Sequence, residues 1–390
     1  MKEKSHSERL MSLDALRGAD MLFIMGFSGA IVALCEVCGF GRDCWLATQM
    51  THVAWHGFRH HDTIFPLFLF LAGVSWPFSY AKQVAMGRSK AQIVRKILLR
   101  AFCLFAIGLM WSDLFSFNWR MYRWDSVLAH IGICWAGAAL IFMFVKNWRV
   151  RLGLAAVILV GYWLMLVCFR APDAEALLAS TDPGVMKKVA SYATYGTDNF
   201  SFTGNIVGWF DRTFMPGRLH EGIFDPDGLL CKLTGLVTAM LGTFAGELLR
   251  RTDLSGNRKT LILLGAGVVS LLVCLVWMPW CPVNKKIWTP TFVLAAGSYS
   301  FIALAVFYWI IDVRGWRRWS FFFQVIGMNA ITIYVIRRVV PLRPIGEFFL
   351  KGVASRGDAA WSSLVLSLGE VAVGWLILWF LYRKKVFLKV

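Results

Sequence analysis

The chain has 390 residues, of which 58% are hydrophobic, and its formal net charge is +18. This composition excludes an ordinary soluble globular protein, in which only about half of the residues are apolar. The positive charge does not indicate nucleic-acid binding, because the basic residues form short clusters between apolar runs rather than one patch.

Ten apolar runs are long enough to cross a membrane, since a helix of about 20 residues spans the ~30 Å hydrocarbon core. They predict an all-α, polytopic helical bundle of about 10 (10–11) transmembrane helices that forms one domain over residues 1–390. The short alternating segments typical of transmembrane barrels do not occur in the sequence. The predicted spans are 19–36, 64–81, 97–115, 128–145, 152–169, 229–248, 260–277, 289–312, 320–336 and 361–382.

Lysine and arginine are frequent at both ends of the chain and in alternate loops, such as 82–100 and 250–259. Cytoplasmic loops carry such an excess, so both termini are predicted to be cytoplasmic. Residues 51–62 then lie on the extracytoplasmic side. Residues 171–228 are predicted to form a long extracytoplasmic loop, and loops of this length are usually lids or binding surfaces.

Two charged residues precede the first span, in the stretch S-L-D-A-L-R-G. Asp14 and Arg17 stand three residues apart, so they can pair on one face of a helix. Arg17 is either a phosphate contact or an anchor that fixes the topology.

The stretch from Thr51 to Asp62 places four histidines, an arginine and an aspartate just before an apolar run. His52, His56 and His60 recur every four residues and would share one face if the stretch were helical. His56 and His60 resemble half of a zinc site, but zinc needs further ligands that the sequence does not obviously place, and no metal is expected.

An acid–base site needs only one of these imidazoles, because histidine titrates near neutral pH and can accept a proton from an amine or hydroxyl. Asp62 could orient that imidazole or stabilise its charged form. The alternative is a belt of aromatic and basic side chains that is solvated at the level of the lipid head groups.

Three later motifs place polar residues at or within predicted spans. Lys285 and Lys286 lie at the outer mouth of a span, which favours an anionic ligand or a paired acid. Asn329 lies inside a span, where its amide needs a hydrogen-bond partner on a helix or a ligand. Asp225 and Asp227 flank a proline before the span at 229–248, and at least one of them is expected to cap that helix.

Taken in order, five motifs resemble the heparan-alpha-glucosaminide N-acetyltransferase family, whose bacterial relatives are polytopic membrane acyltransferases. The resemblance extends from Arg9 to about Tyr334. The motifs are R-L-M-S-L-D-A-L-R-G, H-V-A-W-H-G followed by D-T-I-F-P-L-F-L-F-L-A-G-V-S, F-D-P-D-G-L-L, P-V-N-K-K-I-W-T-P and G-M-N-A-I-T-I-Y-V. That family carries an acetyl group from cytosolic acetyl-CoA across the membrane to a sugar.

The resemblance implies acetyl-CoA as co-substrate, an amino sugar or glycan as acceptor, a bacterial inner-membrane location and a possible homodimer. The family's H-x-x-W-x-G motif matches His52, Trp55 and Gly57, which makes His52 the catalytic histidine with Asp62 as its partner. Residues expected on the coenzyme side are Asp14, Arg17, Asn284, Lys285, Lys286, Trp288, Asn329 and Tyr334. Residues expected on the acceptor side are Trp55, His56 and Asp225.

Two chemical routes and one rival function stay open at this point. His52 either removes a proton from the acceptor or first attacks the thioester to form an acetyl-imidazole. The rival function is a proton-coupled transporter of a small solute, in which the same histidines would relay protons.

Overall fold

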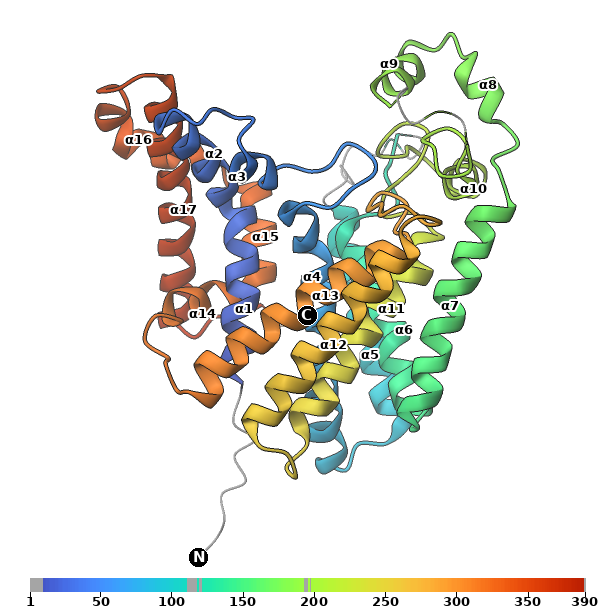
Figure 1. Cartoon of the computed structure of the whole chain (residues 1–390). Helices are drawn as coiled ribbons and strands as arrows, with labels where there is room; N and C mark the ends of the chain where they lie inside the picture. The colour runs from blue at the N-terminus through green and yellow to red at the C-terminus, as the bar shows by residue number, and fades with distance from the viewer. Residues whose placement is uncertain (1–9, 111–117, 119–120, 193–195, 197, 389–390) are drawn as a thin grey trace, which may run out of the picture. The chain divides into compact units, whose positions relative to one another are not determined.

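The computed structural model describes residues 10–110, 118, 121–192, 196 and 198–388 (Figure 1). Regular structure in these ranges is helical, and β pairing is limited to two isolated bridges. The predicted all-α fold is therefore confirmed, and the chain is an integral membrane protein. Seven described helices are long and apolar enough to span a bilayer, at Met11–Val37, His60–Ala85, Val127–Phe144, Trp148–Cys168, Gly256–Trp277, Pro290–Val313 and Ala359–Arg383.

The predicted count of ten spans is not confirmed. Helices α5 (Lys90–Met110) and α11 (Cys231–Arg250) coincide with two further predicted spans but are not among the seven. The predicted span at 320–336 is broken into α14 (Phe321–Gly327) and α15 (Ala330–Val339).

The chain forms two compact units, and the division between them falls within helices α12 and α13. One unit comprises residues 1–51, 252–265 and 301–389, and the other comprises residues 52–251 and 266–300. The first unit, hereafter unit 1, contains α1 (Met11–Leu22), α2 (Ser28–Val37), α3 (Trp45–Gln49), α14, α15, α16 (Leu342–Ala354) and α17 (Ala359–Arg383). The other, unit 2, contains α4 (His60–Ala85), α5, α6 (Val127–Phe144), α7 (Trp148–Cys168), α8 (Ala174–Leu178), α9 (Pro183–Ser191), α10 (Ile206–Phe214) and α11. The two dividing helices are α12 (Gly256–Trp277) and α13 (Pro290–Tyr308).

In unit 2, α4 and α11 approach each other backbone to backbone. A Cβ atom added at Gly242 of α11 would collide with the carbonyl oxygen of Phe70 in α4, and one at Gly73 would collide with the carbonyl oxygen of Ala239. Helices in membranes associate closely where small residues let their backbones meet. This contact fixes α4, whose first turn carries Asp62.

In unit 1, two helices are interrupted. A π-helical turn at Phe23–Phe27 separates α1 from α2, with Gly26 at a φ of 119°. The break between α14 and α15 falls at Met328 and Asn329. Beside these interruptions, Arg337 donates to Glu370 of α17 at 2.6 Å.

The segment 171–228 is not an open loop. It contains the short helices α8, α9 and α10, and two of its acidic side chains bind cations elsewhere in unit 2: Asp225 binds Arg123, and Glu221 binds Lys286. Whether it faces the extracytoplasmic side, as predicted, stays a prediction.

Candidate active site

Residues 51–59 are irregular, and α4 begins at His60. The condition for a common face of His52, His56 and His60, a helix through this stretch, is therefore not met. The cause is a local cap at the N-terminus of α4. Asp62, in the first turn, accepts the backbone N–H of Arg59 at 3.2 Å, so the helix begins after Arg59 and does not extend back to His56. Asp62 also accepts the backbone N–H of Val53 at 3.4 Å, so the same carboxylate folds the preceding loop back onto the helix.

His52 and Asp62 meet as the sequence predicted. Nδ1 of His52 lies 2.7 Å from Oδ1 of Asp62. The Asp62 side chain is only 2% exposed, whereas that of His52 is 55% exposed. A buried carboxylate therefore holds an imidazole whose other edge can be reached from outside.

Lys285 joins this pair from a distant part of the sequence. Its Nζ lies 3.2 Å from His52 Nδ1 and 3.5 Å from Asp62 Oδ1. Burial lowers the pKa of Lys285, while the charge of Asp62 opposes that effect. Lys285 is thus paired with the acid that orients the histidine.

The distances assign the tautomer of His52. An ionised carboxylate and an ammonium group cannot both be satisfied by one ring nitrogen, because the first accepts and the second donates. The shorter contact is with Asp62, so Nδ1 carries the proton and donates it to Asp62. Nε2 then holds the lone pair, which is the arrangement that a general base or a nucleophile requires.

The loop that carries Lys285 is shaped by Asn284. Its Oδ1 accepts the backbone N–H groups of Lys286 at 2.8 Å and Ile287 at 3.2 Å, and its Nδ2 lies 3.4 Å from His56 Nδ1. Gly57 donates its backbone N–H to Val283 at 2.8 Å and has a φ of 129°, which explains a glycine at this motif position. Burial lowers the pKa of His56. Asn284 and His56 therefore position the two loops that meet at His52.

Lys286 points to a different acid from Lys285. Its Nζ donates to Glu221 at 2.8 Å and to the hydroxyl of Tyr192, whose ring lies 4.6 Å from the same nitrogen. Lys188 donates to the other oxygen of Glu221 at 2.5 Å. The paired-acid interpretation of the two lysines is therefore supported, and Lys286 ties the loop at 284–289 to the segment 171–228.

Two predicted ligand-binding tryptophans are buried. Trp55 is 1% exposed, and its indole N–H donates to the carbonyl of Phe200 at 2.8 Å. Trp288 is also 1% exposed, and its ring packs between Phe65 and His130 at centroid distances of 4.9 and 4.8 Å. In this structure both side chains form the walls behind the site rather than its accessible surface.

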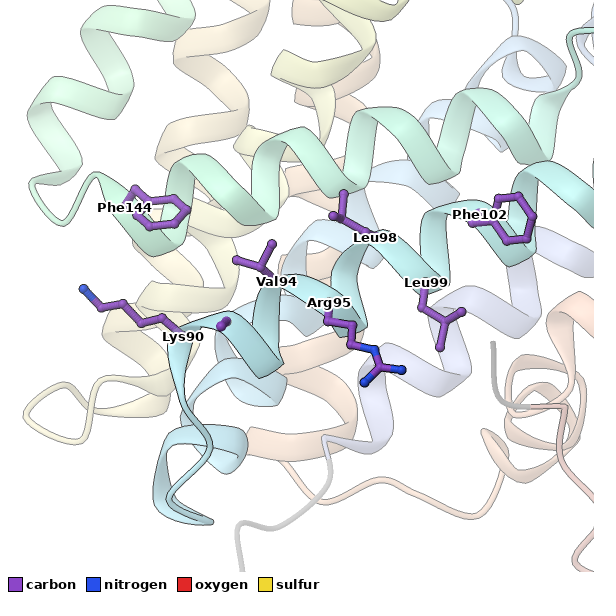
Figure 2. Close-up of a pocket in the computed structure, with 8 residues that line it drawn as sticks. Lys90, Val94, Arg95, Leu98, Leu99, Phe102 and Phe144 are labelled. Atoms are coloured by element: carbon purple, nitrogen blue, oxygen red, sulfur yellow. The ribbon is translucent and has the colours of Figure 1, made fainter.

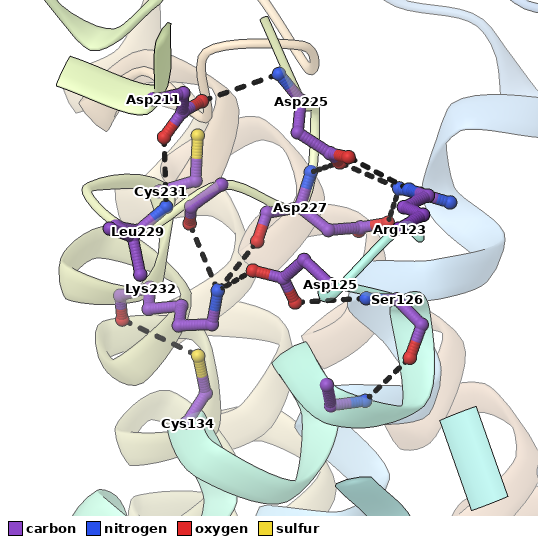
Figure 3. Close-up of polar contacts among 12 residues, drawn as sticks. Arg123, Asp125, Ser126, Cys134, Asp211, Asp225, Asp227, Leu229, Cys231 and Lys232 are labelled. Atoms are coloured by element: carbon purple, nitrogen blue, oxygen red, sulfur yellow. Dashed lines mark hydrogen bonds and ion pairs between the residues drawn. The ribbon is translucent and has the colours of Figure 1, made fainter. Parts of the chain in front are cut away.

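Asp225 belongs to a buried network of charges (Figure 3). Arg123 binds it with two hydrogen bonds, of 2.7 and 2.6 Å, and also donates to Asp227 at 2.8 Å. Lys232 binds the carboxylate of Asp125 and the backbone oxygen of Asp227. Asp225 is fully buried, so here it holds the structure in place.

The network contains carboxyl groups with opposite pKa shifts. Burial alone would raise the pKa of Asp225, but hydrogen bonds and attraction from Arg123 outweigh burial and lower it. Burial raises the pKa of Asp211 to about 7, although backbone N–H groups of Leu229 and Asp225 bind its two oxygens. Burial and the charge of Asp225 also raise the pKa of Asp227 to about 7. The network therefore retains protons near neutral pH.

Neither Asp225 nor Asp227 caps α11, so that prediction is wrong. The helix begins at Cys231, and Leu230 precedes it without a side-chain cap. The two carboxylates instead neutralise Arg123, a residue about 100 positions earlier in the chain.

The remaining predicted coenzyme residues lie in unit 1. Arg17 Nη1 is 3.5 Å from Asp14 Oδ1, which confirms that they can pair within one helix. Asn329, at the break between α14 and α15, is 2% exposed, and its amide nitrogen has no hydrogen-bond partner. Tyr334 lies in α15. All four residues belong to unit 1, whereas His52 belongs to unit 2.

Several residues of the site were missed by the sequence interpretation. They are Arg123, Asp125, Tyr192, Asp211, Glu221 and Lys232. The available signal was the presence of acids and bases in or beside segments predicted to be extracytoplasmic. The pairs Glu221–Lys286 and Asp125–Lys232 span 65 and 107 positions, so they have no local pattern in the sequence. In the described part of the chain, no cluster of three or more His, Cys, Asp or Glu is suited to a metal ion.

Comparison with characterised proteins adds an independent observation. No family model matches the chain. It is 28% identical to human heparan-alpha-glucosaminide N-acetyltransferase over 98% of its own length and 25% identical to the mouse protein over 99%. The chain spans about 60% of the length of these relatives. The resemblance found in the motifs is thereby confirmed: over nearly its whole length the chain is similar to heparan-alpha-glucosaminide N-acetyltransferases.

Proposed function

We propose that the chain is a membrane acetyltransferase that moves an acetyl group from acetyl-CoA to an amino sugar or glycan. The observation that carries this proposal is the contact between His52 and Asp62, which leaves the lone pair of Nε2 on an accessible imidazole. The names of the similar proteins support the reaction class.

In the direct route, Nε2 of His52 removes a proton from the acceptor amine or hydroxyl as that group attacks the acetyl carbonyl carbon. A bond from nitrogen or oxygen to carbon forms, and the carbon–sulfur bond of the thioester breaks. The imidazolium, stabilised by Asp62, returns the proton to the departing coenzyme A thiolate. Lys285, 3.2 Å from His52, is the cation best placed to stabilise the developing oxyanion.

In the second route, Nε2 attacks the acetyl carbonyl carbon, the carbon–sulfur bond breaks, and coenzyme A leaves as the thiolate. The acceptor amine or hydroxyl then attacks the acetyl-imidazole, the bond from Nε2 to carbon breaks, and the proton of the acceptor passes to Nε2. Both routes need the same tautomer of His52. Acetylated protein recovered after exposure to acetyl-CoA alone would favour the second route, and its absence in rapid-quench samples would favour the first.

The proposal includes a direction across the membrane. Acetyl-CoA is taken from the cytoplasmic side, where the basic loops are predicted to lie, and the acceptor binds on the opposite side. Asp14, Arg17, Asn329 and Tyr334 are proposed to contact the coenzyme, and the unpaired amide nitrogen of Asn329 supports this role. A bacterial inner-membrane location and a homodimer complete the proposal.

The test is release of coenzyme A by the purified protein in the presence and absence of glucosamine. Release that depends on the amino sugar, together with an acetylated sugar product, supports the acetyltransferase. Proton-coupled uptake of a solute by sealed proteoliposomes, without thioester turnover, would instead support the transporter.

A further inference from the structure

A groove of about 660 Å³ runs along α5 and reaches the end of α6 (Figure 2). Its walls are mainly apolar and include Val94, Leu98, Phe102 and Phe144. Leu98 is 53% exposed, Phe102 65% and Phe144 60%, so the groove presents hydrocarbon on the outside of unit 2. An exposed apolar surface of this kind on a membrane protein suits an acyl chain.

Two exposed cations line the groove. Lys90 lies at the end beside Phe144, and Arg95 lies farther along α5, between Val94 and Leu99 (Figure 2). They belong to a run that also holds Lys82, Arg88, Lys96 and Arg100, and the sequence from 82 to 110 contains no Asp or Glu. The charges acting on Lys96 are those of three cations, Lys82, Arg88 and Arg100. Such crowding of like charges is relieved by an anion.

We propose that this groove binds an anionic phospholipid, with its phosphate at Lys90, the cation at one end of the groove, and one acyl chain against Val94, Leu98 and Phe102. Basic pockets at the ends of membrane helices recognise anionic head groups. The apolar length of the groove selects a lipid over a soluble phosphate, because a soluble ion would leave these side chains uncovered. The proposal rests on the membrane location of the chain and is independent of the acetyltransferase activity.

The test uses the purified full chain after removal of lipid, with phosphatidylglycerol or phosphatidylcholine as the probe. Native mass spectrometry is expected to retain phosphatidylglycerol, and the apparent unfolding temperature is expected to rise with that lipid alone. The double variant Lys90→Ala, Arg95→Ala should bind it at least tenfold more weakly. Lys146→Ala, Arg149→Ala removes two exposed cations outside the groove and should bind as the wild type does.

A separate variant tests the acyl-chain part of the site. Val94→Trp fills the groove and should reduce retention of phosphatidylglycerol while both cations stay in place. Equal retention of the two lipids, or unchanged retention in the Lys90, Arg95 variant, would overturn the proposal. Displacement of the lipid by free coenzyme A would also overturn it, since the basic end would then be a site for a soluble phosphate compound.

Discussion

His52 and Asp62 are 2.7 Å apart although they belong to different kinds of structure, an irregular loop and the first turn of a helix. The same carboxylate caps α4, binds the loop backbone and holds the imidazole. The folding of the loop and the orientation of the proposed base therefore depend on one buried group. This relationship underlies the predictions that follow.

Lys285→Met is expected to lower kcat by about 10- to 100-fold, because the variant loses a charged donor near the reacting centre. The lost ammonium group lies 3.2 Å from the imidazole of His52. Steady-state kinetics at one pH measure the effect on kcat. Lys187→Met provides the matched control, since Lys187 lies on α9, away from the loop that carries Lys285. A wild-type kcat in Lys285→Met would contradict a role beside His52.

Asp211 predicts a pH dependence of stability. Its pKa is raised to about 7 by burial, so the folded state keeps a proton that the unfolded state releases near pH 4. The resulting stabilisation is complete below pH 4 and is lost as the pH rises through 7, with a limiting slope of about 1.4 kcal/mol per pH unit. The apparent unfolding temperature should therefore fall between pH 5 and 8.5.

The control for this effect is Asp211→Asn, which cannot ionise. Its unfolding temperature should be lower at pH 5, because an amide replaces one of two oxygens that accept backbone N–H groups at a cost of about 1–3 kcal/mol. Between pH 5 and 8.5 the unfolding temperature of Asp211→Asn should fall less steeply than that of the wild type. An equally steep fall would show that Asp211 is not the group that keeps a proton in the folded state.

Glu221→Gln is expected to make the segment 171–228 more mobile, because the variant loses the charge that pairs Glu221 with Lys286 and Lys188. Limited proteolysis between residues 171 and 192 should be several-fold faster, and KM for the acceptor should rise more than KM for acetyl-CoA. Glu175→Gln removes the carboxylate of an exposed ion pair with Arg170, which should contribute less than about 1 kcal/mol. Equal rates of cleavage in the two variants would argue against this link.

Gly242→Ala tests the contact between α4 and α11. Because the added methyl would meet the carbonyl oxygen of Phe70, we expect a loss of about 1–3 kcal/mol of stability. Gly161→Ala in α7 is the matched control, since an added Cβ there meets nothing within 4 Å. Thermal unfolding in detergent measures the stability of both variants. Equal unfolding temperatures for Gly242→Ala and Gly161→Ala would mean that α4 and α11 can move apart without loss of stability.

The sequence predicted those features of the fold and site that depend on local composition. Apolar runs identified the helical membrane fold, and a spacing of three residues predicted the contact of Asp14 with Arg17. The sequence also predicted Asp62 as the partner of His52, but it left open whether the stretch before His60 is helical, and the cap at Arg59 excludes a helix through His56. Periodicity alone does not show where a side chain will end a helix.

Other features depend on contacts between distant residues and could not be predicted in this way. Lys285 reaches His52 across 233 positions, and Arg123 reaches Asp225 across 102. The break at Asn329 is hidden in a continuous apolar run, since hydrophobicity reports burial but not backbone continuity. The assignment of Asp225 as a cap failed for the same reason, because its partner lies in another loop.

The most direct test of the account is acetyl transfer from acetyl-CoA to glucosamine by purified His52→Ala and Asp62→Asn, with His220→Ala as a control in an exposed histidine. In His52→Ala, kcat should fall about 10³-fold or more, because the variant lacks the nitrogen lone pair that accepts the proton. In Asp62→Asn, kcat should fall at least 100-fold, because the variant lacks the carboxylate that holds the reactive tautomer of His52. His220→Ala should keep activity within about twofold. Transfer by His52→Ala at the wild-type rate would contradict the proposed chemistry.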